Sequence, residues 1–388
     1  MQGDLLLIKT HIIGNDQLIT DNNDMIQKER LLQTFLTLLK INSYYPDEEE
    51  VMQVLRAKLT RVGMTFSEDQ ARNLLGTWAG TGNMIETEPV LLCAHVDTVR
   101  PTIGMEPIVR DGRVWSDGSS VLGADDKAAV AAIVEAIESI ADQAVDHPPV
   151  EVLFTVGEDI GHIGSKAFDV APVQSKLAFI PDSGGPVGQI ILASPWSQSL
   201  KVKFHGRAAH AGIEPENGQN ALLMAARAIA SLPWGQIDDQ STANIGTVVG
   251  GEAANIVAPE AEMVVQIRSL SQQKHLRYID DVLQACTQAA ADLGGSMEHE
   301  VLMQMSGFEF ETSDPIVQRA ISAIESTGRK PSSTVSCGGS DANELNAKGL
   351  KTLVLSVGYE DIHSNQEAMP LDELNALTDV CTALILQK

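Results

Sequence analysis

The sequence predicts an α/β protein that is interrupted by a smaller α+β unit. In residues 1–190 and 306–388, apolar runs of strand length alternate with helical segments, the order that gives a mixed, mostly parallel sheet with helices on both faces. Residues 191–305 follow the order β-α-β-β-α-β, which is that of a ferredoxin-like domain. We therefore predict one α/β domain in two parts, 1–190 and 306–388, with an inserted domain at 191–305.

The first part begins with two helical segments and continues with apolar strands. Residues 25–40 carry apolar side chains at helical spacing, and residues 47–62 begin with an acidic turn, which suits the positive end of a helix dipole. Further along the chain we predict strands within 90–98, 150–159 and 176–185, a hairpin with Asp-Gly turns at 108–118, and an Ala-rich helix at 127–139. Residues 1–24 are polar and weakly patterned, and we expect a frayed extension there.

The inserted unit and the last part complete the pattern. In the insert we predict strands at 197–206, 243–249, 262–269 and 295–304 and helices at 219–232 and 272–293. After residue 306 we predict helices at 315–326 and 342–347, a loop at 336–341, a strand at 352–357 and a last helix from 371.

Composition and charge narrow the range of partners. A chain of 388 residues with 44% hydrophobic residues can bury a sizeable core. Its formal net charge of -25 repels phosphate backbones and anionic lipid, so we expect neither nucleic acid nor membrane as a partner. No apolar run reaches the roughly 18–20 residues of a membrane span. Because Leu5–Ile8 is also too short for the apolar part of a signal peptide, we expect a cytoplasmic location.

The cysteines agree with a reducing compartment. They show no CxxC spacing, and we expect reduced thiols at Cys93, Cys286, Cys337 and Cys381.

Six short motifs carry the candidate functional residues, and each ends or follows an apolar run. They are AHVDT at 94–98, LGADDK at 122–127, GEDIG at 157–161, PDSGG at 181–185, GRAAHAG at 206–212 and GYEDIHS at 358–364. Their His, Asp and Glu side chains are ligands of hard or borderline divalent cations. Open α/β sheets place their sites at the carboxyl ends of the strands, so the motifs predict a metal site at that edge.

Taken singly, each motif also has a simpler interpretation. The alternatives are a salt-bridged pair for His95 and Asp97, N-terminal helix acids for Asp125 and Asp126, an exposed acidic turn for Glu158 and Asp159, a turn residue for Asp182 and a solvated side chain for His363. The combination favours a two-metal site. Three carboxylates and a hydroxide neutralise two divalent cations, two histidines give each cation a nitrogen ligand, and one glutamate remains as a base.

These motifs, together with GGSDAN at 338–343, resemble those of a known family. The resemblance covers the chain from about residue 29 onward. The chain resembles the dinuclear zinc exopeptidases and deacylases, which include peptidase T, carboxypeptidase G and acetylornithine deacetylase. It is most similar to the peptidase T-like branch, on LGADDK, GGSDAN and GYEDIH.

The resemblance implies a ligand set for each metal. One metal would be held by His95, Asp125 and Asp182, and the other by Asp125, Asp159 and His363, with Asp125 as the bridge. It also implies a cis peptide bond after Asp125. The family usually has two glutamates where this chain has Glu158 and Asp159, so one ligand of the second metal is shorter by one methylene.

Other roles also follow from the resemblance. Glu158 corresponds to the general base and Asp97 to the acid that orients a histidine ligand. In the inserted domain, which would be a lid, His210 corresponds to a residue that stabilises the developing oxyanion, often across a dimer. Asn255 and Arg268 correspond to lid residues that hold substrate, and Arg268 suits a carboxylate.

We therefore expect a metal-dependent amidohydrolase, a tripeptidase-like aminopeptidase of short peptides that works as a homodimer through the lid. The expected cofactors are two divalent ions, zinc first, with cobalt or manganese as alternatives. N-acyl amino acid deacylation is the first alternative, because both substrate classes offer an amide and a carboxylate. An inactive zinc-binding dimeric scaffold is the second.

Overall fold

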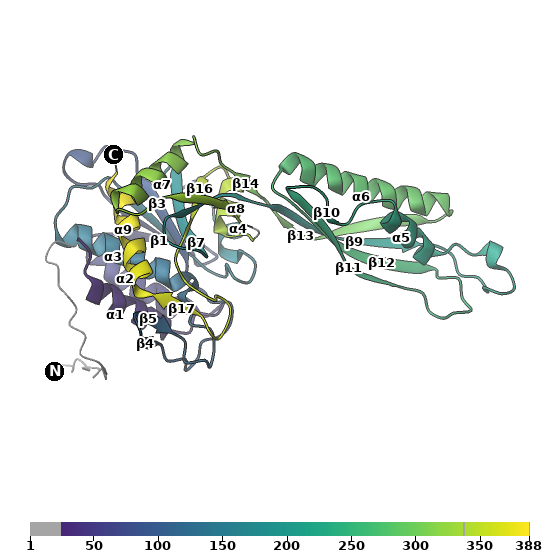
Figure 1. Cartoon of the computed structure of the whole chain (residues 1–388), viewed down its shortest axis with the longest axis horizontal. Coiled ribbons are helices and arrows are strands. Elements are labelled where there is room, and N and C mark those ends of the chain that lie inside the picture. The colour runs from purple at the N-terminus through teal and green to yellow at the C-terminus, as the bar shows by residue number, and fades with distance from the viewer. Residues whose placement is uncertain (1–24, 337, 388) are drawn as a thin grey trace.

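Two separate sheets give the molecule its two lobes, which Figure 1 shows end to end. The computed structural model describes residues 25–336 and 338–387. The predicted extension at residues 1–24 lies outside the described residues. We call the part built on the larger sheet the α/β lobe and the part built between residues 196 and 305 the inserted lobe.

The α/β lobe is built on a nine-stranded mixed sheet with the order β1-β2-β6-β3-β7-β16-β8-β14, in which β15 also pairs with β8. Its strands are β1 Thr65–Glu68, β2 Leu74–Trp78, β3 Val90–His95, β6 Val150–Thr155, β7 Leu177–Ser183, β8 Gln189–Ser194, β14 Phe308–Glu309, β15 Ser332–Val335 and β16 Lys351–Ser356. The four central strands β6, β3, β7 and β16 are parallel. Their carboxyl ends therefore lie at one edge of the sheet.

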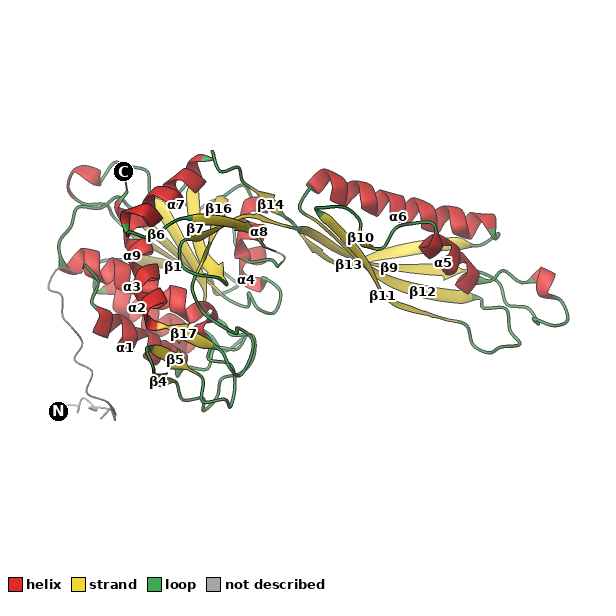
Figure 2. Ribbon diagram, viewed as in Figure 1, coloured by secondary structure: helices red, strands yellow, loops and turns green. Residues whose placement is uncertain are grey.

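Helices cover both faces of this sheet, because its central strands are apolar on both sides (Figure 2). On one face, Leu92 and Val152 pack with helices α1 Lys28–Leu39, α2 Glu49–Thr60, α3 Ala124–Asp142, α7 Pro315–Ser326 and α9 Leu371–Leu386. On the other face, Leu91 and Cys93 pack against α8 Asp341–Ala347 and the residues that follow the short α4 Ile163–Ala167. Burial of apolar surface on both faces is the main favourable term for such a layered fold.

Helix α3 begins at the carboxyl edge of the sheet, packs on one face of it and is buried over almost its whole length. Its many alanines let the backbone approach the sheet closely, so the start of the helix is held in a packed environment. A small antiparallel sheet, β4 Ile108–Arg110, β5 Arg113–Trp115 and β17 Ala368–Pro370, contains the predicted Asp-Gly hairpin at residues 111–112.

The inserted lobe is an antiparallel sheet with two helices on one face. Its strands, in the order β10-β11-β12-β9-β13, are β9 Trp196–His205, β10 Gly235–Gln236, β11 Ser241–Gly250, β12 Glu260–Ser269 and β13 Ser296–Met305. Helices α5 Ala221–Ala230 and α6 Gln272–Asp292 cover one side, where Leu200, Met263 and Val282 form a second core. The order of the four long strands is that of the predicted ferredoxin-like domain.

The predicted fold class is confirmed, with two local differences. The hairpin of β1 and β2 was not predicted, because its nine strand residues show neither a long apolar run nor a strong turn signal. The predicted change of domain at residue 191 falls inside β8, which pairs with β16 in the α/β lobe. The chain passes to the second sheet after Ser194.

Two other expectations bear on the environment of the chain. Among the described residues, no helix is long and apolar enough to cross a membrane. Cys93, Cys286 and Cys381 are free and buried, and Cys337 lies outside the described residues.

Candidate metal-binding active site

The candidate site lies where three neighbouring parallel strands end. His95 is the last residue of β3, Glu158 and Asp159 follow β6, and Asp182 lies near the end of β7. Because these strands are adjacent in the order β6-β3-β7, their terminal side chains meet at one edge. Two further segments complete the site, the start of α3 and the loop after β16.

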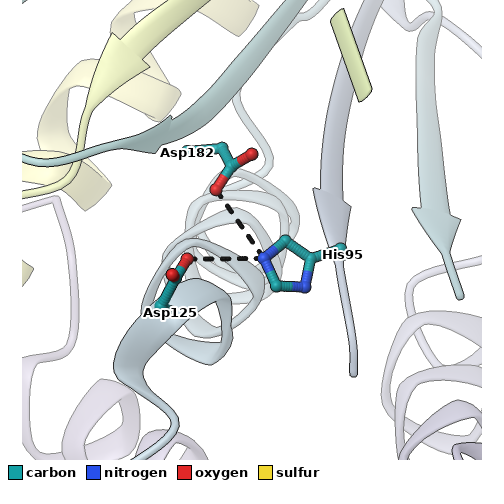
Figure 3. A group of neighbouring side chains, drawn as sticks. All are labelled: His95, Asp125 and Asp182. Carbon is teal, nitrogen blue, oxygen red and sulfur yellow. Dashed lines mark hydrogen bonds and ion pairs between the residues drawn. The ribbon is translucent and has the colours of Figure 1, made fainter. Parts of the chain in front are cut away.

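His95 lies at the centre of the first group of ligands (Figure 3). Its Nε2 atom is 3.4 Å from Asp125 Oδ1 and 3.7 Å from Asp182 Oδ1. Figure 3 shows both carboxylates directed at the same nitrogen. All three residues can offer one ligand atom each to a single cation. The imidazole is buried, so this group is shielded from bulk water.

Asp125 is placed by an irregular start of helix α3. Asp125 and Asp126 have non-helical backbone angles, and the peptide bond between them is cis, as the family resemblance implied. Gly123 precedes them with a φ of 79°, and a Cβ atom there would lie 2.9 Å from the Thr98 side chain. Glu367 accepts hydrogen bonds from the backbone N–H groups of Gly123 (3.0 Å) and Asp125 (3.1 Å). Glu367 therefore fixes the segment that presents the Asp125 carboxylate.

A second group of ligands shares Asp125 with the first. His363 Nε2 lies 3.0 Å from Asp125 Oδ2 and 3.1 Å from Asp159 Oδ1. The Asp159 side chain thus reaches the second group, although it is one methylene shorter than a glutamate. His363 comes from the loop after β16, and Arg100 donates a hydrogen bond of 2.8 Å to its carbonyl oxygen. Its side chain is 48% exposed, against 1% for His95, so the second group is the more open one.

Asp97 contacts residues of both ligand groups but belongs to neither of the two groups that share Asp125. Its Oδ1 atom lies 3.2 Å from His95 Nδ1 and accepts the backbone N–H of Glu158 at 3.0 Å, while Oδ2 accepts that of Asp159 at 3.1 Å. One carboxylate therefore orients the imidazole and holds the loop after β6. Asp97 is also near enough to His95 and Asp159 to form a third candidate ligand group, but its oxygens already receive these donors.

Glu158 stands beside both groups and is a member of neither. Its side chain is 11% exposed, and its Oε1 atom lies 3.4 Å from His162 Nε2. His162 Nδ1 lies in turn 3.5 Å from Glu344 Oε1 on α8. A carboxylate that is close to the ligands, yet outside both groups, is suited to accept and return a proton.

The electrostatics of the site reflect many carboxylates in a small volume. Burial raises the pKa of Asp182 to about 7, partly offset by its contact with His95. Burial and the neighbouring Asp182 raise the pKa of Glu158 well above its usual range. Hydrogen bonds to Asp125 and Asp159 raise the pKa of His363 to about 10. Burial alone would lower the pKa of His95, but Asp125, Asp182 and Asp97 raise it well above the usual value.

These features fit a pair of divalent cations. Two groups of three ligands share one carboxylate, and each group has one imidazole nitrogen, the donor set of dinuclear zinc or cobalt sites. Asp159 Oδ2 is buried without a hydrogen-bond partner among the described residues. Burial and, after it, repulsion between carboxylates raise the pKa of Asp182 and Glu158, and cations at these positions would offset both effects.

Two of the three predicted residues of the inserted lobe, His210 and Asn255, lie at the end of that lobe away from the junction. His210 follows the far end of β9, which begins at the junction of the lobes and, at ten residues, extends about 30 Å. It is exposed and pairs with Ile256, next to Asn255, whose carbonyl accepts the N–H of Ala211. Arg268 lies near the other end of the lobe, where β12 pairs with the first residues of β9.

Several residues around the site carried no sequence signal that we used. Glu367 is four residues beyond His363, Glu344 lies within a short helix, and Asp341 was grouped only with the GGSDAN motif. Asp341 accepts hydrogen bonds from Ser165 and from Thr155 (2.5 Å), the last residue of β6. His162 contacts Glu158 and belongs to neither ligand group. Only the tertiary fold makes these residues neighbours.

Comparison with known proteins identifies the family. The model of peptidase family M20/M25/M40 matches residues 91–387. The protein YqjE of Bacillus subtilis is 38% identical over 368 residues, which is 93% of this chain and 99% of that protein. The crystal structure of aminopeptidase PepT from Bacillus cereus has a TM-score of 0.88 at 37% identity and covers 93% of this chain and 99% of its own.

A further solved structure supports the same branch. A tripeptidase from Staphylococcus aureus has a TM-score of 0.84 at 34% identity, over 93% of this chain and 98% of its own. The fold and the family motifs thus agree with the resemblance to the peptidase T-like branch. The chain belongs to peptidase family M20/M25/M40.

Proposed function

We propose that this protein is a two-metal aminopeptidase that hydrolyses short peptides, with tripeptides as the preferred class. The observation that carries the proposal is the pair of ligand groups that share Asp125, with Glu158 beside them and outside both. The similarity to an aminopeptidase and a tripeptidase at 37% and 34% identity supports the substrate class.

In this proposal one metal is held by His95, Asp125 and Asp182, and the other by Asp125, Asp159 and His363. Zinc suits these ligands, and cobalt or manganese are alternatives. When bound, two such cations supply Lewis acidity, which lowers the pKa of water and polarises a carbonyl group.

The side chains of the chain itself move the proton and hold the geometry. Glu158 takes a proton from the attacking water and delivers it to the leaving amine, a role that suits a carboxylate lying beside both ligand groups and outside them. Asp97 keeps His95 oriented through Nδ1 and holds the backbone of Glu158 and Asp159 in place.

The inserted lobe acts as a lid and as a dimer interface in this proposal. His210 donates a hydrogen bond to the developing oxyanion, while Asn255 and Arg268 hold the substrate. Because His210 lies at the far end of its own lobe, it reaches a metal cluster most directly in a second copy of the chain. The exposed outer strand β13, with Val301, Leu302 and Met303, offers an edge for such a dimer.

A substrate panel tests the proposed activity. The metal-free protein would be incubated with zinc, cobalt or manganese and then with dipeptides, tripeptides, blocked tripeptides and N-acyl amino acids. We expect release of the first residue from tripeptides with a free amino end, and little turnover of the blocked ones. Faster turnover of the N-acyl amino acids would favour a deacylase, and no turnover at full metal content would favour a scaffold.

Removal of the metals should destabilise the protein more at higher pH. The pKa of Asp182 is about 7 in the fold against 3.8 when unperturbed, so the metal-free fold loses stability as the pH rises from about 4 to 7. The contribution of His363, with its pKa raised to about 10, is present below pH 6.5 and is lost as the pH approaches 10. The difference in unfolding temperature between metal-loaded and metal-free protein should therefore widen from pH 5.5 to 8.5.

The Asp182→Asn variant is the control for this measurement. It removes the ionising group, so the metal-free variant should show a shallower loss of unfolding temperature over the same pH range. If the difference in unfolding temperature between the metal-loaded and the metal-free unmodified protein stays constant or narrows as the pH rises, the charge argument is contradicted.

Substitution of Glu158 should separate proton transfer from metal binding. Glu158→Gln preserves the shape of the side chain and removes its basicity, so kcat should fall by at least about 100-fold. Metal content, measured by mass spectrometry, and the unfolding temperature should stay close to those of the unmodified protein. Turnover near that of the unmodified protein would show that Glu158 is not the base.

Mixed dimers test whether His210 acts on the partner. His210→Ala and Glu158→Gln should each be nearly inactive alone. In co-expressed hybrids, the His210→Ala subunit keeps Glu158 and receives His210 from its partner. With random pairing, activity should recover to about a quarter of that of the unmodified dimer, since half of the dimers are hybrids with one intact site each. Activity that only equals the sum of the two separate variants would exclude a shared site.

A further inference from the structure

The two lobes are joined by two short chain crossings that run side by side. On the α/β side, Ser194 of β8 pairs with Phe308 of β14, and on the inserted side Ser197 of β9 pairs with Met305 of β13. The junction between these two ladders consists of residues 195–196 and 306–307 (Figure 2). The crossings are in close contact, because a Cβ atom on Gly307 would lie 2.5 Å from the Trp196 ring. Any change in the angle between the lobes must be absorbed here.

One buried side chain of the α/β lobe holds both crossings. Asn343 Nδ2 donates hydrogen bonds to Ser194 Oγ at 2.9 Å and to the Ser306 carbonyl at 2.7 Å. Its Oδ1 accepts the backbone N–H of Ser340 at 2.9 Å, which ties the amide to the start of α8. The side chain is fully buried, so these bonds do not compete with water.

Helix α8 also contacts the end of β6 and the loop after it, which carries Glu158. Asp341, the first residue of α8, accepts a hydrogen bond from Thr155 at the end of β6, three residues before Glu158. Glu344 contacts His162, which contacts Glu158. One helix of seven residues thus links the junction of the lobes to the surroundings of Glu158.

We propose that Asn343 is a positioning residue that sets the orientation of the inserted lobe relative to the metal cluster. It does so by holding the outgoing and returning crossings to one point on α8. Loss of its two donated hydrogen bonds frees the junction without removing any side chain that touches a ligand group. The effect on turnover rests on the proposed function, whereas the effect on lobe orientation does not.

Asn346 provides a matched control on the same helix. Its Nδ2 donates to the carbonyls of Ala342 (2.9 Å) and Thr352 (2.7 Å), and its Oδ1 accepts the Thr352 N–H at 3.1 Å. It therefore makes the same number of hydrogen bonds as Asn343, but all of them stay within the α/β lobe. A purely structural role would make Asn343→Ala and Asn346→Ala behave alike.

The test measures the orientation of the lobes directly. Probes for distance measurement would be attached to azide-bearing residues at Gln288 on α6 and Ser322 on α7, both exposed, in protein diluted with unlabelled copies. We expect Asn343→Ala to broaden or shift the distribution of distances, and Asn346→Ala to leave it unchanged. Ser194→Ala, which removes one acceptor and is the milder change, should give a smaller effect in the same direction.

Kinetics of the metal-loaded enzyme provide a second measurement. Hinge substitutions change kcat and KM together, so kcat/KM on the best peptide should fall about tenfold in Asn343→Ala at unchanged metal content, and less than about twofold in Asn346→Ala. An unchanged distance distribution in Asn343→Ala and Ser194→Ala, or equal broadening in Asn346→Ala, would overturn the proposal. If no peptide is hydrolysed, the distance measurement still decides it.

Discussion

The need to hold many carboxylates together at one edge of a sheet dominates the structure of the α/β lobe. Seven of them lie nearly or fully buried around one point: Asp97, Asp125, Asp126, Glu158, Asp159, Asp182 and Asp341. Buried like charges repel each other strongly, and the fold offsets this with imidazoles, backbone N–H groups and hydroxyl donors. The remaining negative charge suits the cluster to the divalent cations proposed for it.

Rigid elements keep this arrangement in place. His95 and Asp182 belong to central strands that are buried on both faces, and Asp125 starts a helix that is buried along almost all its length. Asp97 and Glu367 then fix the two loops that present Glu158, Asp159 and Asp125. Geometry that is fixed by packing before a ligand arrives costs little when the ligand binds, which is the usual basis of preorganised sites.

The inserted lobe obeys a different constraint. It has its own core, and among the described residues the chain passes between the two lobes through a two-stranded junction. This separates the cluster from the residues at the far end of the lobe, including His210 and Asn255. A reaction that needs both sets of residues must therefore bring them together by rotation about the junction or through a second copy of the chain.

The sequence by itself determined the α/β class and the ferredoxin-like insert, which follow from apolar runs of strand length and from helical spacing. His, Asp and Glu residues at strand ends, as for His95 and Asp182, predicted a metal site at that edge, and the division of the ligands into two groups was implied by the family resemblance. The hairpin of β1 and β2 and the place where the chain leaves β8 were not predictable, because short edge strands take their pattern from their neighbours.

Only the tertiary structure decided which residues support the ligands. The sequence assigned no supporting role to Glu367, Asp341 or Asn343, because their partners are distant in sequence, as for Glu367 and Gly123. It also decided that His210 lies far from the cluster of its own chain. The physical reason is that hydrogen bonds and charge contacts of this kind depend on packing between elements, whereas strand and helix patterns depend on neighbours along the chain.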